Sequence, residues 1–119
     1  MNKEFLYTLL DNMSVSGHEI ELQKKVIAEM NDYCDENRTD YTGNVISVLN
    51  PEADFKVLLC GHIDEIGFIV TSISHDGSLK VTNAGGVRAV LYLGTQVQIK
   101  TKTGINAMIT NLPGMLNPL

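Results

Sequence analysis

The chain has 119 residues, a formal net charge of -5 at pH 7, 44% hydrophobic residues and 19% charged residues. The length is that of about one domain. The composition is typical of a globular protein and lacks the polar bias of an intrinsically disordered segment. The nine lysines and arginines are scattered and form no basic stripe that could neutralise phosphates, so we expect no nucleic-acid partner. Every apolar run is shorter than a membrane span, so we expect no membrane partner either.

The N-terminal segment lacks the features of an export signal. Residues 1–13, MNKEFLYTLLDNM, carry charges within a short amphipathic pattern instead of an uninterrupted apolar core. We therefore expect a cytoplasmic protein in which Cys34 and Cys60 stay reduced. Because Cys60 lies in an apolar run, we expect it to be a small core residue.

Two amphipathic helices are predicted in the first third of the chain. Apolar residues spaced by three and four positions indicate a helix that ends near Asn12. A second apolar stripe, from Leu22 to Tyr33, indicates another helix. Ser16 is its candidate N-cap, because Glu19 follows three residues later as in a capping box.

A β hairpin and a buried strand are predicted next. The turn residues Thr42–Asn44 separate a polar segment, residues 35–40, from the alternating pattern of residues 45–49. The following run Lys56–Cys60, KVLLC, is almost continuously apolar. Such a run is typical of a strand covered on both faces, so we expect both faces of this strand to be buried.

The second half of the chain predicts only β structure. Its candidate strands are short and separated by glycine-containing turns: residues 68–73, 78–82, 90–92, 95–100 and 107–110. The change from mixed helix and strand to strand alone predicts an α/β part, residues 1–67, and an all-β part, residues 68–119. Because no linker separates them, we expect the β part to be inserted into the first fold.

A polar interruption, Gly61–Glu65, separates two apolar runs. His62 and Asp64 directly follow the predicted buried strand, where side chains can point into the crevice at the carboxyl end of a sheet. Neutral imidazole is a common metal ligand, and a carboxylate often fixes its second ring nitrogen. The H-x-D spacing can supply both groups. It also fits a structural histidine that only makes hydrogen bonds within the fold.

The other two histidines carry weaker signals. His18 lies near the start of the second predicted helix, where we expect a surface residue. His75 stands beside Asp76 and Gly77, so we expect it to be a hairpin turn residue.

The run LLCGHIDEIGFIV, residues 58–70, resembles the metal-binding segment of the glutamyl aminopeptidase or tetrahedral aminopeptidase family of dinuclear metallopeptidases. Three further segments resemble that family in the same order: SVSGHEIE at 14–21, DYTGNVISV at 40–48 and NAGGVRAVLYLGTQVQI at 83–99. The resemblance implies the N-terminal part of a metallopeptidase α/β catalytic domain in residues 1–67, followed by part of an inserted β domain in residues 68–119.

The resemblance also implies roles for two side chains. His62 matches the first metal ligand of the family, and Asp64 matches the catalytic acid that orients this histidine. Glu65 matches the signature too, but we assign it no chemistry and expect it to cap or pair locally. The complete enzyme would hold two divalent ions per subunit, zinc or cobalt, act on peptide substrates, and form a homo-oligomer through the inserted β domain.

Family members are much longer, and their remaining metal ligands and general base lie downstream of these segments. We therefore expect this chain to be an N-terminal fragment of a metal-dependent aminopeptidase and to be inactive alone. Two other interpretations stay open: a non-catalytic remnant or β association module, and a related co-catalytic metallohydrolase that acts on acylated amino acids.

Overall fold

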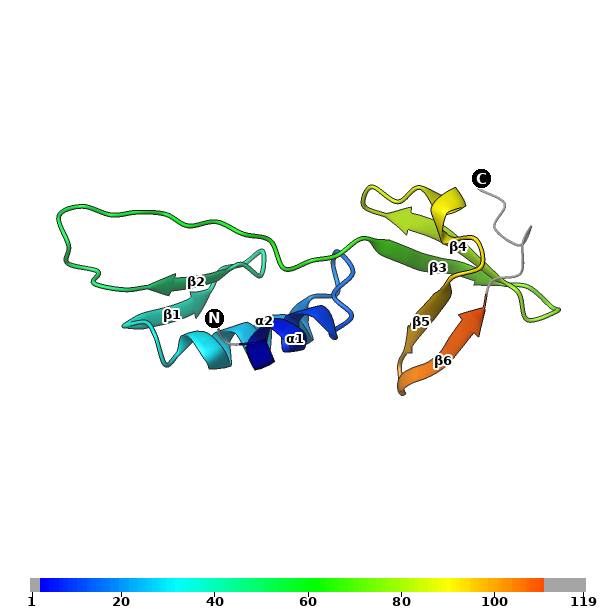
Figure 1. The fold of residues 1–119 in the computed structure, drawn as a ribbon, viewed down its shortest axis with the longest axis horizontal. Coiled ribbons are helices and arrows are strands. Elements are labelled where there is room, and N and C mark those ends of the chain that lie inside the picture. The colour runs from blue at the N-terminus through cyan, green and yellow to red at the C-terminus, as the bar shows by residue number, and fades with distance from the viewer. Residues whose placement is uncertain (1–2, 111–119) are drawn as a thin grey trace. The chain divides into compact units, whose positions relative to one another are not determined.

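The computed structural model describes residues 3–110, and the chain divides into two compact units, Met1–Glu65 and Ile66–Leu119. The first unit mixes helix and strand, and the second is built of strands with one short 3₁₀ turn (Figure 1). The boundary predicted from the sequence, between residues 67 and 68, lies two residues after the boundary between these units. In the part of the chain that the structure describes, no helix is long and apolar enough to cross a membrane.

The two helices predicted in the first unit are confirmed, with shorter ends. Helix α1 spans Lys3–Leu10 and helix α2 spans Ile20–Met30. Helix α2 buries Leu22, which is 2% exposed. The predicted N-cap at Ser16 is wrong, because Glu19 occupies that position and makes no side-chain capping bond. The carboxylate of Glu19 instead accepts the Gly17 N–H within the preceding turn, at 2.7 Å.

The predicted hairpin is also confirmed. Strand β1, Glu36–Thr39, pairs antiparallel with strand β2, Val45–Val48, in the register Glu36 to Val48 and Thr39 to Val45. Polar side chains join α2 to this hairpin. The Gln23 amide donates to the Gly43 carbonyl oxygen at 2.6 Å, and the Asn37 amide donates to the Ile27 carbonyl oxygen at 2.9 Å.

The turn between β1 and β2 is organised by the carboxylate of Asp40. One oxygen accepts the backbone N–H groups of Thr42 and Asn44, at 3.0 and 2.9 Å, and the Thr42 hydroxyl at 2.9 Å. The other oxygen accepts the Asn44 side-chain amide at 2.8 Å. The hydrogen bond from the Asn44 side chain, followed by the other donors, lowers the pKa of Asp40 from 3.8 to about 2.

We expect Asp40→Asn to lower the melting temperature at neutral pH, since it removes the charge that these donors stabilise. The folded-state pKa lies below the unfolded one, so this stabilisation is present above about pH 4 and is lost as the pH falls through about 2. The difference in melting temperature between the two proteins should therefore shrink between these pH values. Circular dichroism melts across that range measure it, with Glu52→Gln as the control; a difference that stays constant contradicts the assignment.

The strand predicted at residues 56–60 is wrong for this structure. The segment between β2 and the second unit runs as irregular chain without a strand partner (Figure 1). Leu58 and Leu59 are 84% and 90% exposed, and Cys60 is exposed rather than part of a core. A strand buried on both faces needs neighbouring strands and helices to cover it. The first unit's described strands, β1 and β2, pair only with each other.

The second unit contains two antiparallel hairpins. Strand β3, Gly67–Ile73, pairs with β4, Leu79–Ala84, and strand β5, Gln96–Thr101, pairs with β6, Gly104–Thr110. The predicted strands in these regions are confirmed. The strand predicted at residues 90–92 is wrong, because Ala89–Tyr92 forms a short 3₁₀ helix.

A small apolar cluster holds the β3–β4 hairpin to the following turn. The rings of Phe68 and Tyr92 meet edge to face with centroids 5.6 Å apart. Ala84 and Val87 are buried in this unit. Gly85 between them has φ +79°, and a β carbon there would lie 2.9 Å from the Ile66 side chain, so only glycine fits without strain.

Candidate metal-binding site

The segment His62–Glu65 lies at the end of the first unit and contacts the turn between the two helices. The Glu65 N–H donates to the Ser14 carbonyl oxygen at 2.9 Å, and Val15 and Glu65 form an isolated parallel bridge. The segment is therefore attached to the body of the unit, although the residues just before it are not.

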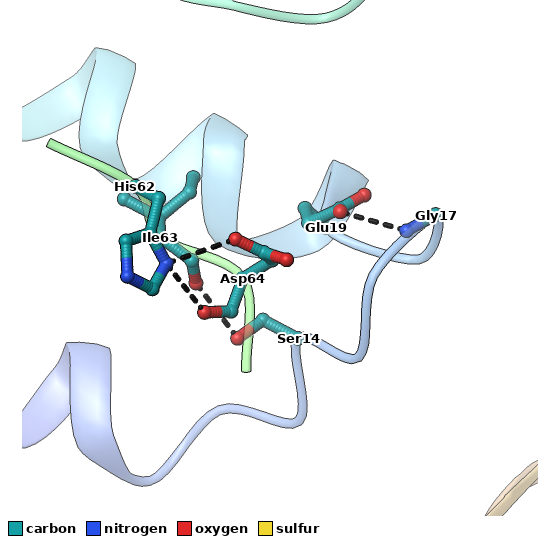
Figure 2. A network of polar contacts seen from close by, with 6 residues as sticks. All are labelled: Ser14, Gly17, Glu19, His62, Ile63 and Asp64. Atoms are coloured by element: carbon teal, nitrogen blue, oxygen red, sulfur yellow. Dashed lines mark hydrogen bonds and ion pairs between the residues drawn. The ribbon is translucent and has the colours of Figure 1, made fainter. Parts of the chain in front are cut away.

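His62 and Asp64 contact each other directly. The Nδ1 atom of His62 lies 2.9 Å from Asp64 Oδ1 and 3.0 Å from the Asp64 carbonyl oxygen. Figure 2 shows both contacts on the same ring nitrogen, while the other nitrogen faces away from Asp64. A carboxylate at Nδ1 favours the tautomer with the proton there, which leaves Nε2 with a free lone pair.

The exposure of the pair suits a ligand group. The His62 side chain is 86% exposed and that of Asp64 is 37% exposed. Nε2 of His62 is therefore accessible to an ion, and the ring is oriented from behind by a partly covered carboxylate. This donor set fits one corner of a divalent-metal site.

A complete metal site needs more ligands than this pair supplies. Catalytic zinc sites use three protein ligands and leave a position open. Among residues 3–110, no group of three or more histidine, cysteine, aspartate or glutamate side chains is placed to hold an ion. Any further ligands must come from outside the described residues.

Sequence reasoning missed the role of Ser14 in this segment. Ser14 is 2% exposed, and its hydroxyl donates to the Ile63 carbonyl oxygen at 2.9 Å (Figure 2). Its N–H donates to Glu65 Oε1 at 3.0 Å. The expected local partner of Glu65 is therefore wrong, because its partner lies 51 positions away. No periodicity or motif relates residues so far apart, so the sequence alone held no signal for it.

The remaining candidate residues lie where the sequence placed them. His18 is exposed in the turn before α2, and His75 is exposed in the turn between β3 and β4. Beside it, the carboxylate of Asp76 accepts the Ser78 N–H at 2.9 Å, which closes that turn. Within the first unit, no described hydrogen bond or ion pair joins His18 to His62.

Comparison with known proteins relates the chain to one family. The model of the M42 glutamyl aminopeptidase family matches residues 43–117. A lysyl aminopeptidase of Pyrococcus furiosus is 31% identical over 102 residues, which cover 85% of this chain and 29% of that protein.

Solved structures agree with the family match. A TET aminopeptidase from the marine sediment archaeon Thaumarchaeota archaeon SCGC AB-539-E09 is 34% identical, with a TM-score of 0.81 over 87% of this chain and 29% of that one. The TET1 peptidase of Pyrococcus horikoshii, which can assemble into a tetrahedron or a large octahedral shell, is 30% identical. It has a TM-score of 0.80 over 93% of this chain and 33% of that one.

The chain thus spans about a third of the length of these relatives. The family model covers more than half of the chain. The matching solved structures share the mixed helix and strand content of this chain. The resemblance found in the sequence is confirmed, and the chain belongs to the M42 glutamyl aminopeptidase family.

Proposed function

We propose that this chain is the N-terminal third of a metal-dependent aminopeptidase that removes N-terminal residues from peptides. Residues 1–67 would belong to its catalytic α/β domain and residues 68–119 to an inserted β domain. Family membership and the names of the relatives support the aminopeptidase activity. The observation that carries the metal dependence is the His62–Asp64 pair, which leaves one exposed imidazole nitrogen free.

In this proposal His62 holds one of two divalent ions, zinc or cobalt, and Asp64 fixes the histidine ring. A metal held by His62 and the further ligands would supply polarisation of the scissile carbonyl and activation of water. The remaining ligands and the general base come from the part of the protein beyond this chain. His62 and Asp64 thus serve to bind and orient, and by themselves move no proton of the substrate.

We also propose that the complete protein forms homo-oligomers through the inserted β domain. Two solved structures of TET1 peptidases support this association, because one holds a dodecamer and the other protein can assemble into a tetrahedron or a large octahedral shell. The second unit also carries exposed apolar side chains on strand β3 and the 3₁₀ turn, which are suited to contact with another chain: Ile69, Val70, Ile73, Val90 and Leu91. The cytoplasmic location stays a prediction, which cell fractionation can test.

We expect the full-length protein to hydrolyse aminoacyl p-nitroanilides with zinc or cobalt present, and the isolated 119-residue chain to show no turnover. The reason is that one histidine and one carboxylate cannot hold the metal and supply a general base as well. The measurement is a panel of aminoacyl substrates with each metal, using a His62→Ala variant to set the background. Turnover by the isolated chain above that background contradicts the proposal, as does a full-length protein inactive on the whole panel.

A further inference from the structure

Ser14 contacts both peptide units that flank Asp64. Its hydroxyl donates to the Ile63 carbonyl oxygen, which belongs to the peptide unit between Ile63 and Asp64. Its own carbonyl oxygen accepts the N–H of Glu65, which belongs to the peptide unit between Asp64 and Glu65. Because a peptide unit is planar, these two bonds restrict the backbone orientation on both sides of Asp64.

The side chain of Glu65 makes a third hydrogen bond with Ser14, in which Ser14 is the donor. Its Oε1 atom accepts the Ser14 N–H at 3.0 Å. Both the backbone and the side chain of Glu65 are therefore bound to Ser14, which is itself almost fully buried. These bonds are partly buried, and a hydrogen bond in a medium of lower dielectric is electrostatically stronger than one in water.

The His62 ring depends on this backbone for its orientation. Its side chain is 86% exposed, so packing against neighbours can do little to fix it. The ring instead contacts Asp64 twice through Nδ1, once at the carboxylate and once at the carbonyl oxygen. That carbonyl oxygen belongs to the same peptide unit whose N–H Ser14 accepts, so a rotation of the unit would move the ring's contact.

We propose that Ser14 and Glu65 form a clamp, the Ser14–Glu65 clamp, which holds the segment 62–65 so that Nε2 of His62 points toward the metal. Both are positioning residues and neither touches the ion. The proposal rests on the proposed function, since it takes His62 to be a metal ligand. It adds a buried serine, contributed by the turn between the two helices, that sets the geometry of a site far away in the chain, at His62.

Four variants of the full-length protein test the clamp. Ser14→Ala removes the hydroxyl that holds the Ile63 carbonyl oxygen, and Glu65→Ala removes the acceptor of the Ser14 N–H. Glu65→Gln keeps an oxygen acceptor in the same place and should restore the wild-type properties. The matched control is Ser47→Ala, which deletes a hydroxyl bonded to Asn37 Oδ1 at 3.1 Å within the hairpin.

Zinc affinity is the main readout, measured by competition with a chromophoric chelator. We expect Ser14→Ala and Glu65→Ala to weaken zinc binding about 10- to 100-fold, the usual effect of losing a group that orients a ligand. Glu65→Gln and Ser47→Ala should bind zinc as the wild type does. Because Glu65 is exposed, its truncation leaves no buried cavity, so that variant serves even where Ser14→Ala does not fold. Wild-type zinc affinity in folded Glu65→Ala overturns the clamp.

A second readout separates the clamp from the proposed function. Hydrogen–deuterium exchange of the peptide spanning residues 61–66, in metal-free protein, should become faster in Ser14→Ala and Glu65→Ala but not in Ser47→Ala. If the wild type binds neither zinc nor cobalt, the proposed function fails, whereas the exchange result still tests whether Ser14 holds the segment. Unchanged exchange in both clamp variants overturns the inference, whatever the zinc data show.

Discussion

Replacing His62 by alanine is expected to remove about one metal ion per subunit from the full-length protein, because a first-ligand histidine supplies a bond that no neighbour can replace. Asp64→Asn is expected to keep the metal stoichiometry and to weaken affinity and turnover by roughly 10- to 100-fold. Asparagine still offers an oxygen to Nδ1 of His62 at this position but loses the negative charge. Elemental analysis of the purified proteins and zinc titration measure the two effects.

The two substitutions have these different effects on metal content only if His62 binds a metal ion and Asp64 orients it. If the hydrogen bond between His62 and Asp64 only stabilises the fold, both variants should lose thermal stability while their metal content stays unchanged. His75→Ala is the matched control, since it removes an exposed histidine from the β3–β4 turn of the other unit. Full metal occupancy in His62→Ala, with the control unchanged, ends the ligand assignment.

The His62–Asp64 pair could be predicted because its geometry is local. Two residues separated by one position reach each other through a single bend of the chain, and the H-x-D pattern records that directly. The position of Ser14 could not be predicted in the same way. Helix α2 and the β1–β2 hairpin separate it from residues 63–65 in the chain, so the contact is a product of tertiary structure.

The elements that the sequence predicted correctly are also those stabilised by nearby residues. Helices α1 and α2 follow from apolar spacing, and the β1–β2 hairpin follows from a turn whose donors converge on Asp40. The 3₁₀ helix at residues 89–92 was missed, since a short apolar run fits several conformations equally well. Local patterns thus sufficed only where local contacts decide the structure.

The segment 56–60 is the main case in which a local pattern and the structure disagree. Its composition is that of a strand buried on both faces, yet its side chains are exposed. Relatives about three times as long as this chain match it over only about a third of their own length, which leaves much of each relative to supply covering elements. Under the proposal that this chain is part of a longer enzyme, partner strands in the rest of that enzyme cover the segment.

Substituting Leu58 by lysine is expected to act in opposite directions in the two contexts. In the isolated 119-residue chain, where Leu58 is 84% exposed, the exposed apolar segment should drive self-association, and a lysine should reduce it. In the full-length protein the same lysine would enter a covered strand, and an unpaired buried ammonium group costs several kcal/mol, enough to prevent folding. Light scattering of the isolated chain and expression of folded full-length protein measure the two outcomes.

Glu52→Lys is the control for this prediction, because it places a lysine at an exposed polar position in the turn that precedes the same segment. It should leave both the association of the isolated chain and the folding of the full-length protein unchanged. A full-length Leu58→Lys protein that folds with wild-type thermal stability would show that residues 56–60 stay exposed in the complete molecule. In that case the composition of KVLLC reflects contact with another chain, and not a strand inside the catalytic domain.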